Sequence, residues 1–201
     1  GESGAQVDSD NHIVTIPETL VHQALETVPH EFWLFDAAGN PSIRYGGDAV
    51  QFDPGSSGVN ILDPETLQHK PAESDDLIRL IKVAEMLPQY AAQSTAVVCH
   101  DVPKEIGDIY RLYLVLLFSR KPVVTGSFST RTTQAMFELL AIACDNKQNL
   151  ADKPRAIFDV CPTPPLIWSK FAAQSLVDLA RANVPAEIVS MPLAGAAAPV
   201  T

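Results

Sequence analysis

Four short apolar runs recur at nearly even intervals in the second half of the chain, and a polar or glycine-containing loop follows each one. The runs span residues 95–99, 122–124, 155–159 and 187–189. Helix-length stretches separate them, so the repeat is roughly 30 residues, which is the size of a βαβ unit. Strands that are buried on both faces of a parallel sheet read as continuous apolar runs. The pattern therefore predicts an α/β fold with a parallel sheet.

The chain before these repeats is instead rich in expected short strands. A Thr15-Ile-Pro-Glu18 phrase with the form of a capping box predicts a helix through about Val28. A hairpin is expected over residues 32–45, and short strands over residues 49–52, 59–62 and 67–70. Further helices are expected over residues 74–87, 104–119, 130–145 and 167–182.

Two domains follow from this contrast. We expect an N-terminal helix plus a β-rich extension over residues 1–73, and the first half of a TIM-type barrel over residues 74–201. Four βα units are half of the eight that close such a barrel. The chain starts at Gly1, close before the Gly4–Asp8 motif, and it stops at Thr201, shortly after the fourth expected strand, where a helix should follow. The sequence therefore reads as a fragment of a longer chain.

Composition excludes several classes of function. The net charge of -10, with no local run of Lys and Arg, argues against a nucleic-acid surface. The longest apolar stretch, residues 109–118, contains Arg111 and is too short to cross a membrane. The three cysteines and five histidines lack metal-binding spacing, so no metal site is expected. The odd, sparse cysteine count is typical of a cytoplasmic protein.

Function is expected in the loops that follow the four runs, because α/β enzymes place their chemistry beyond the carboxyl ends of the strands. His100 and Asp101 are candidates for a general acid and base, or for strand-end residues held by local hydrogen bonds. The 125–128 loop offers hydroxyl groups and the Phe128 ring. Cys161 is a candidate nucleophile, but a buried, inert thiol is the expected alternative.

A glycine-rich loop over residues 53–58 precedes the repeats. The loop lacks the lysine of a P-loop, so nucleotide binding is not indicated. Its serines, with Asn60 beyond it, offer hydroxyl and amide groups to a small polar ligand. The alternative is a loose turn with glycines at positive φ.

Several phrases together resemble the trimethylamine methyltransferase family of amine:corrinoid methyltransferases. They run in order across almost the whole chain. The matching residues are 4–8, 16–17, 52–55, 60–63, 101–103, 121–122, 164–166, 192–196 and 198–201. The family fold is a TIM-type barrel of more than twice this length, so the chain resembles its N-terminal half, which we expect to be inactive alone.

The resemblance implies transfer of a methyl group from a methylated amine, either trimethylamine or a quaternary amine such as glycine betaine, to the cobalt of a separate corrinoid protein. No cofactor would then bind this chain directly, and the full-length protein would be a homo-oligomer. Founding members of the family use pyrrolysine, which lies in the later half. The nitrogen must leave as a neutral amine, so the protein would position substrate and stabilise charge.

The candidate substrate-binding residues divide by chemistry. Aromatic faces suit a quaternary ammonium, and hydroxyl or amide donors suit a betaine carboxylate. Core packing is the alternative for at least two of the aromatic residues. The candidates are Phe52, Phe128 and Trp168 for the cation, and Ser56, Ser57, Asn60, Thr125, Ser127 and Thr163 for polar contacts.

Two other functions fit the same pattern. A barrel lyase or aldolase would use His100 and Asp101 as acid and base, although no lysine for a Schiff base follows any of the four runs. A small-ligand binding protein with a doubly wound sheet would fold alone at this length, whereas half a barrel leaves an open edge.

Overall fold

A computed structural model describes residues 3–190 and divides the chain into two compact units, with the boundary between Phe32 and Trp33. In the first unit, strand β1 (Gln6–Asp8) pairs antiparallel with β2 (Ile13–Thr15), and helix α1 (Glu18–Thr27) follows. The helix is confirmed, but its predicted capping box is wrong. Thr15 pairs with Gln6 in the hairpin, and Pro17 is the N-cap without a side-chain hydrogen bond.

The second unit is built on a four-stranded parallel sheet, which confirms the prediction of an α/β fold. Its strands are β7 (Gln93–Ser94), β8 (Val123–Thr125), β9 (Ala156–Val160) and β10 (Ala186–Ile188). They lie in the order β10-β9-β8-β7, so neighbours in the sheet are also successive in the sequence. A sequential order of this kind is shared with βα barrels, and the closed barrel itself stays a prediction.

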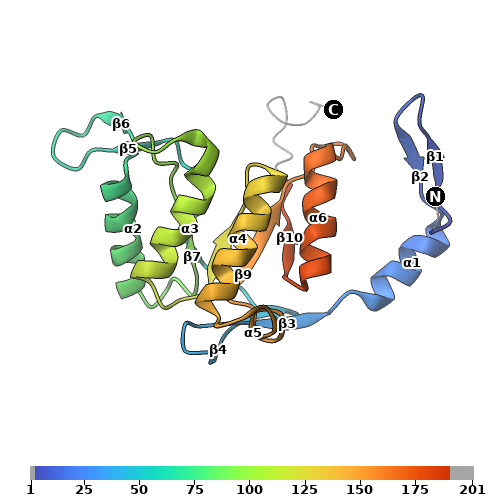
Figure 1. Ribbon diagram of the computed structural model, residues 1–201, viewed down its shortest axis with the longest axis horizontal. Helices are drawn as coiled ribbons and strands as arrows, with labels where there is room; N and C mark the ends of the chain where they lie inside the picture. Colours follow the sequence, from blue (N-terminus) through green and yellow to red (C-terminus); the bar gives the residue numbers. More distant parts are fainter. Residues whose placement is uncertain (1–2, 191–201) are drawn as a thin grey trace. The chain divides into compact units, whose positions relative to one another are not determined.

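Helices connect the successive strands. The helices are α2 (Ser74–Met86), α3 (Gly107–Phe118), α4 (Thr130–Ala143), α5 (Lys147–Asp152) and α6 (Lys170–Ala182), with the 3-10 turn η1 (Lys104–Ile106) before α3. Helices α3, α4 and α6 lie on one side of the sheet (Figure 1). The sequence predicted α2, α3, α4 and α6 closely, but not the six-residue α5.

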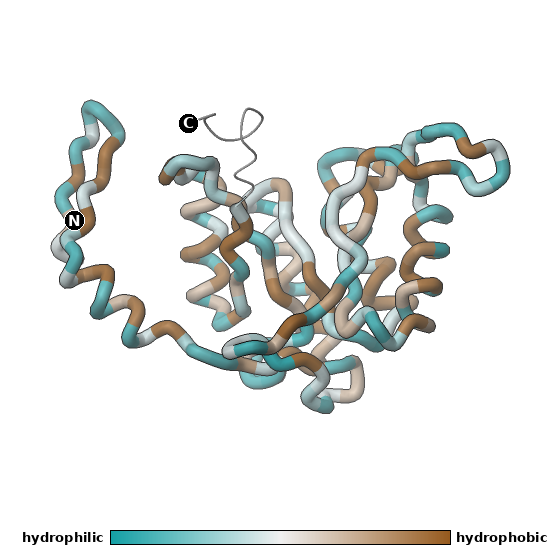
Figure 2. The backbone as a smooth tube through the Cα atoms, turned by 180° about the vertical axis from the view of Figure 1, so that it is seen from behind, coloured by the Kyte–Doolittle hydropathy of each residue, from teal (hydrophilic) through white to brown (hydrophobic). Residues whose placement is uncertain are grey.

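The core lies between these helices and the sheet. Val123 and Phe158 on the strands pack with Leu112, Met136 and Leu179 on the helices, and none of the five side chains is more than 1% exposed. The central strand segments are correspondingly hydrophobic (Figure 2). Burying a side chain of this size contributes about 1.5–3 kcal/mol relative to leaving it exposed, so this layer fixes the positions of the strand ends.

Two small hairpins complete the second unit. The first, β3 (Glu31–Phe35) and β4 (Pro41–Gly46), confirms the predicted hairpin. Backbone hydrogen bonds join it to the residues just before two strands, from Phe35 to Pro154 and from Ala37 to Arg120. The second pairs β5 (Asn60–Leu62) with β6 (His69–Pro71). Residues 49–52, expected to form a strand, do not.

The first apolar run was placed wrongly as a strand. Strand β7 covers only Gln93 and Ser94, ahead of residues 95–99. The amide of Thr95 still donates to the carbonyl of Val124 in β8, but the other backbone bonds of this run go to the glycine-rich loop: Ser57 donates to the carbonyl of Thr95, and Val98 donates to that of Gly58. A single parallel bridge joins Gly58 and Val97. The partner of this run therefore comes from the β-rich front section.

No helix between residues 3 and 190 is long and apolar enough to cross a membrane. The domain boundary expected at residue 73 stays a prediction, and the loop expected at residues 191–195 lies outside the described part of the chain.

Candidate functional site

A pocket of about 270 Å³ opens at the carboxyl ends of β8 and β9. Loops that follow these strands form its walls together with the glycine-rich loop and the first turns of α6. The lining residues are Ser56, Ser57, Gly126, Ser127, Phe128, Asp159, Val160, Cys161, Phe171, Ala172 and Ser175. The sequence singled out five of these residues, Ser56, Ser57, Ser127, Phe128 and Cys161.

The glycine-rich loop reaches the pocket through a tight turn and a close backbone approach. Asp53 accepts the amide hydrogen of Gly55 at 2.8 Å, and Gly55 has a φ of +79°. A Cβ at Gly58 would lie 3.3 Å from the carbonyl oxygen of Ala96, so the close approach favours glycine there. The hydroxyl of Ser94 also bonds to the carbonyl of Gly55. These contacts hold Ser56 and Ser57 beside the end of the sheet.

Hydrogen bonds to neighbouring elements fix the segment 125–128. Thr125 is fully buried, and its hydroxyl lies 3.2 Å from that of Thr95. Ser127 shares a hydrogen bond with the hydroxyl of Thr133 in α4. Phe128 is half exposed, and its amide donates to Asp108 at 2.7 Å. The guanidinium of Arg111 lies 4.7 Å from the Phe128 ring centroid, so a cation of the protein already uses the aromatic ring proposed for substrate.

Acidic groups give the pocket its electrostatic character. Asp159 on β9 stands in register with Glu187 on β10. Burial, followed by the charges of Glu187 and Asp53, raises the pKa of Asp159 to about 7. Burial and the charge of Asp53 also raise the pKa of Glu187. Every one of these contributions disfavours negative charge, so a positively charged ligand would relieve them.

Two further polar groups line the pocket. Ser175 is 5% exposed, and its hydroxyl has no hydrogen-bond partner among residues 3–190, nor has Oδ1 of Asp159. Cys161 is exposed, so the expectation of a buried thiol is wrong. Partial burial and the neighbouring Asp159 and Glu187 raise the pKa of the thiol, which lowers its thiolate fraction and its reactivity as a nucleophile.

The structure places the remaining candidate contacts outside the pocket lining. Thr125 lies beneath it, as described above. Phe52 is 63% exposed, and its carbonyl accepts from Ala91. Asn60 pairs with Pro71 in the β5–β6 hairpin. Thr163 forms two backbone hydrogen bonds with Ile167. The exposed Trp168 lies in the same loop but does not line the pocket either.

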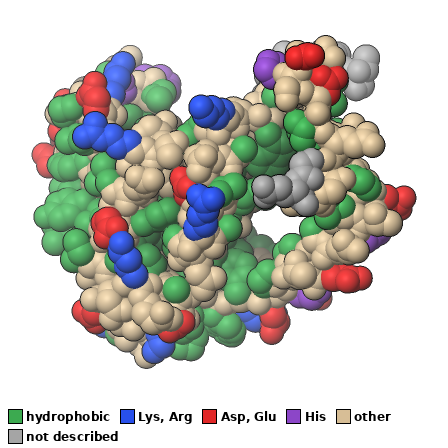
Figure 3. Space-filling model, turned by 45° about the vertical axis from the view of Figure 1, so that its right-hand side comes forward, with side chains coloured by type: hydrophobic (Ala, Val, Ile, Leu, Met, Phe, Trp, Pro, Cys, Tyr) green, Lys and Arg blue, Asp and Glu red, His purple; other side chains and the backbone are tan. Residues whose placement is uncertain are grey.

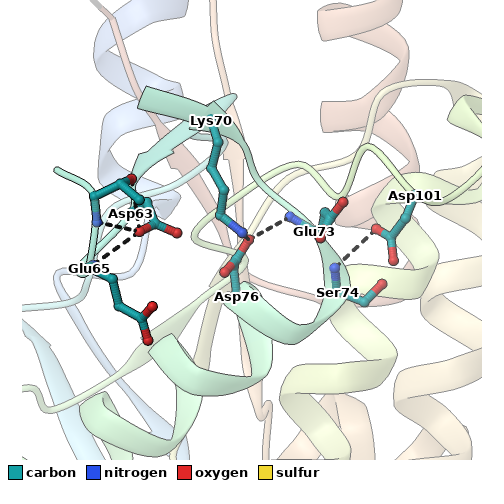
Figure 4. A network of polar contacts seen from close by, with 8 residues as sticks. Asp63, Glu65, Lys70, Glu73, Ser74, Asp76 and Asp101 are labelled. Carbon is teal, nitrogen blue, oxygen red and sulfur yellow. Dashed lines mark hydrogen bonds and ion pairs between the residues drawn. The ribbon is translucent and has the colours of Figure 1, made fainter. Parts of the chain in front are cut away.

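His100 and Asp101 also lie apart from the pocket. Asp101 accepts the amide hydrogen of Ser74 at 3.0 Å, at the first residue of α2 (Figure 4). The network continues to Asp76, which accepts from the amide of Glu73 and pairs with Lys70, each at 3.0 Å. Both His100 and Asp101 are exposed. The structure thus gives Asp101 a role in starting a helix.

Sequence reasoning missed the residues that most shape the pocket. Asp159 was read as the last residue of an apolar strand, and Glu187 as the first residue of another. In both cases the signal for a functional residue was a carboxylate at the end or the start of an apolar run. Arg111 was noticed only as an interruption of the apolar stretch, and Ser175 carried no signal beyond its place in a helix.

A larger groove of about 820 Å³ lies among α4, α5 and α6. Its charged residues have both signs, including Arg131, Glu138 and Asp178. Side chains of both signs are likewise interspersed over the face drawn in Figure 3. We assign the site to the smaller pocket because it lies at the strand ends, where α/β enzymes bind their ligands. No cluster of metal-ligating side chains occurs within residues 3–190.

A parallel sheet whose strand-end loops enclose a small pocket beside Asp159 defines an α/β protein with a candidate ligand site at the strand ends. The chain belongs to the trimethylamine methyltransferase (MTTB) family, whose sequence profile matches residues 1–201. This confirms the family resemblance of the sequence.

The relatives include two kinds of methyltransferase. The chain is 26% identical over 200 residues to the trimethylamine methyltransferase MttB of Desulfitobacterium hafniense. The alignment covers 100% of this chain and 40% of that protein. The chain is 23% identical to MttB of Methanosarcina thermophila, over 99% and 42% of the two chains. It is 27% identical to the proline betaine:corrinoid methyltransferase of Eubacterium limosum, over 98% and 41%. The chain therefore spans about two fifths of the length of these relatives.

Proposed function

We propose that the intact protein transfers a methyl group from a small methylated amine, trimethylamine or a quaternary amine such as a betaine, to the cobalt of a corrinoid carried by a partner protein. The observation that carries this proposal is the family match over residues 1–201. The name of the Eubacterium limosum relative supports the corrinoid as methyl acceptor. We further propose that the sheet of this chain forms half of a closed βα barrel.

The charge of the pocket supports a cationic substrate. A nitrogen that carries a positive charge leaves as a neutral amine, so the charge on nitrogen disappears during methyl transfer. Carboxylates beside that nitrogen stabilise the bound substrate more than the transition state, and such groups improve binding rather than the chemical step. We therefore assign Asp159, which lines the pocket, to substrate recognition and not to catalysis, with Glu187 acting through its charge on Asp159.

The hydroxyl groups provide a second recognition element. Ser56, Ser57 and Ser175 line the same pocket as Asp159. Such groups bind a carboxylate or another polar substituent of the amine through hydrogen bonds. The lyase alternative has less support, because His100 and Asp101 lie outside the pocket and Asp101 bonds to the start of α2.

The test measures methyl transfer with the intact protein. The protein is mixed with a corrinoid protein whose cobalt has been reduced to Co(I), and with trimethylamine, glycine betaine or proline betaine in turn. Absorption spectra follow conversion of the cobalt to its methylated form. Conversion with one of these amines supports the proposal. Failure with all of them, using a corrinoid protein that accepts methyl groups from another methyltransferase, would falsify it.

A further inference from the structure

Helix α3 carries two charged residues in an otherwise apolar, buried position. Asp108 is 1% exposed and Arg111 is 0% exposed, although most of the helix consists of Leu, Ile, Val and aromatic residues. They are three positions apart, so they lie on the same face of the helix. Burying a charge costs several kcal/mol unless good hydrogen bonds offset it, so the contacts of these two residues need an explanation.

Asp108 holds the loop after β8. Its Oδ2 accepts the amide hydrogen of Phe128 at 2.7 Å and also the hydroxyl hydrogen of Thr132 in the first turn of α4. A charged acceptor makes such bonds roughly twice as strong as neutral ones. The carboxylate therefore fixes both the backbone of Phe128 and the start of the helix that follows it.

Arg111 holds the glycine-rich loop and the same aromatic ring. Its Nη1 donates to Oγ of Ser57 at 3.2 Å and to the carbonyl oxygen of Thr95 at 3.0 Å. Its guanidinium also lies 4.7 Å from the Phe128 ring centroid. Ser57 and Phe128 line the pocket, whereas neither Asp108 nor Arg111 does.

We propose that Asp108 and Arg111 are positioning residues that set the shape of the pocket from behind, through Phe128 and Ser57. The inference rests on the proposed function, because it assigns the pocket to the methylated amine. Displacement of a binding group by about 1 Å is enough to cost 10²-fold in rate. Loss of either residue therefore weakens substrate recognition, although neither residue contacts the substrate.

The hydrogen bonding of Arg111 separates this role from a purely structural one. Its Nε and Nη2 have no hydrogen-bond partner among residues 3–190, and burial lowers the pKa of the guanidinium. Replacement of a whole buried ion pair by apolar residues is often neutral or stabilising, whereas removal of one partner is destabilising. Asp108 keeps its hydrogen bonds to Phe128 and Thr132 when Arg111 is replaced, so Arg111→Met should lower stability but still fold while it releases Ser57 and Phe128.

The first test needs no substrate. Amide hydrogen exchange is measured on the intact protein and on Asp108→Asn, Arg111→Met and Arg111→Lys, with the exposed Asp75→Asn and Arg79→Met as matched controls. We expect exchange at Phe128 to rise about tenfold or more in Asp108→Asn, because a charged acceptor is lost. Arg111→Met should speed exchange at Ser57, with a smaller effect in Arg111→Lys. Rates equal to those of the controls would overturn the inference.

The second test uses methyl transfer. In Arg111→Met, kcat/KM should fall about tenfold or more, mostly through KM, because contacts made in both ground and transition states are lost. The effects of Arg111→Met and Ser57→Ala should be less than additive, since both variants remove the Arg111–Ser57 hydrogen bond. This pair of variants serves if Asp108→Asn fails to fold. Additive effects, or a lower melting temperature with normal KM, would count against the inference.

The two tests separate the two proposals. If the wild-type protein transfers no methyl group from any amine, the proposed function fails, and the exchange rates at Phe128 and Ser57 still decide whether Asp108 and Arg111 position the loops. If methyl transfer occurs and the exchange rates match the controls, the proposed function stands and the positioning role fails.

Discussion

Asp159 and Glu187 stand directly opposite each other on the adjacent parallel strands β9 and β10. Like charges at facing positions of a sheet destabilise it, and burial adds to the cost of charging Asp159. This pair therefore links pH and stability in one part of the sheet.

Asp159→Asn should stabilise the protein at pH 8. The folded-state pKa of Asp159 is raised to about 7, so the folded protein holds this proton more tightly than the unfolded chain does. Stability from that proton is present below about pH 4 and is lost as the pH rises towards 7. After a discount for partial solvent screening, the variant should gain about 2 kcal/mol at pH 8.

Thermal unfolding between pH 4 and pH 8 checks this expectation. The gain should shrink towards zero at the acidic end of the range, where Asp159 is protonated in the folded state and about half protonated in the unfolded chain. Asp48→Asn, at an exposed position, is the control. An equal change in melting temperature at both ends of the range would contradict the assignment of a raised pKa.

Substrate affinity should increase with pH through the same group. Only the ionised form of Asp159 attracts a cation, so KM for a quaternary amine should fall as the pH rises through about 7. A quaternary nitrogen does not titrate, which leaves the protein as the source of the effect. Steady-state kinetics from pH 6 to pH 8 measure it. Asp159→Asn should flatten the profile without lowering kcat, and a profile that keeps its slope in this variant would exclude Asp159.

Gly58→Ala and Gly107→Ala should have opposite effects. A Cβ at Gly58 would lie 3.3 Å from the carbonyl oxygen of Ala96, so we expect a loss of about 1 kcal/mol or more as the loop shifts. A Cβ at Gly107 would meet nothing within 4 Å, and at this first position of α3 alanine should gain part of the about 0.8–1.0 kcal/mol by which it is favoured over glycine in a helix interior. Denaturant unfolding of the two variants provides the comparison. Equal effects would contradict the close approach at Gly58.

Asp101→Ala should lower stability and leave methyl transfer intact. The substitution removes the acceptor for the amide of Ser74 at the start of α2, and loss of such a terminal acceptor costs about 1 kcal/mol. Unfolding and kinetics are measured on the same preparation, with His100→Ala as companion. A large fall in kcat in either variant would revive the acid–base role considered from the sequence.

Elements stabilised by their own sequence pattern were predictable. Helix α2 has acidic residues in its first turn and a periodic apolar face, and β9 is a continuous apolar run. Strand β7 was misplaced because residues 95–98 bond to Ser57 and Gly58, some forty positions earlier. No local pattern encodes such a pairing.

The residues of the candidate site likewise include some that the sequence predicted and some that it did not. Ser57 and Phe128 were found because they occupy loops next to strand ends, where pockets form. Thr125 was expected in a strand-end loop but is the last residue of β8, and its hydroxyl faces Thr95 beneath the pocket. Asp159 and Arg111 were missed because a charged residue inside an apolar run has no defined partner until the fold supplies one.

The pairing of the glycine-rich loop with residues 95–98 has a consequence for dissecting the protein. A shortened chain that begins at Ser74 would keep every helix and strand of the parallel sheet. It would also strip the carbonyls of Thr95 and Ala96 and the amide of Val98 of their partners. The segment that follows β7, the outermost strand, would then expose unpaired backbone groups to other molecules, and such groups at a sheet edge promote self-association. The glycine-rich loop thus protects this edge of the sheet from aggregation.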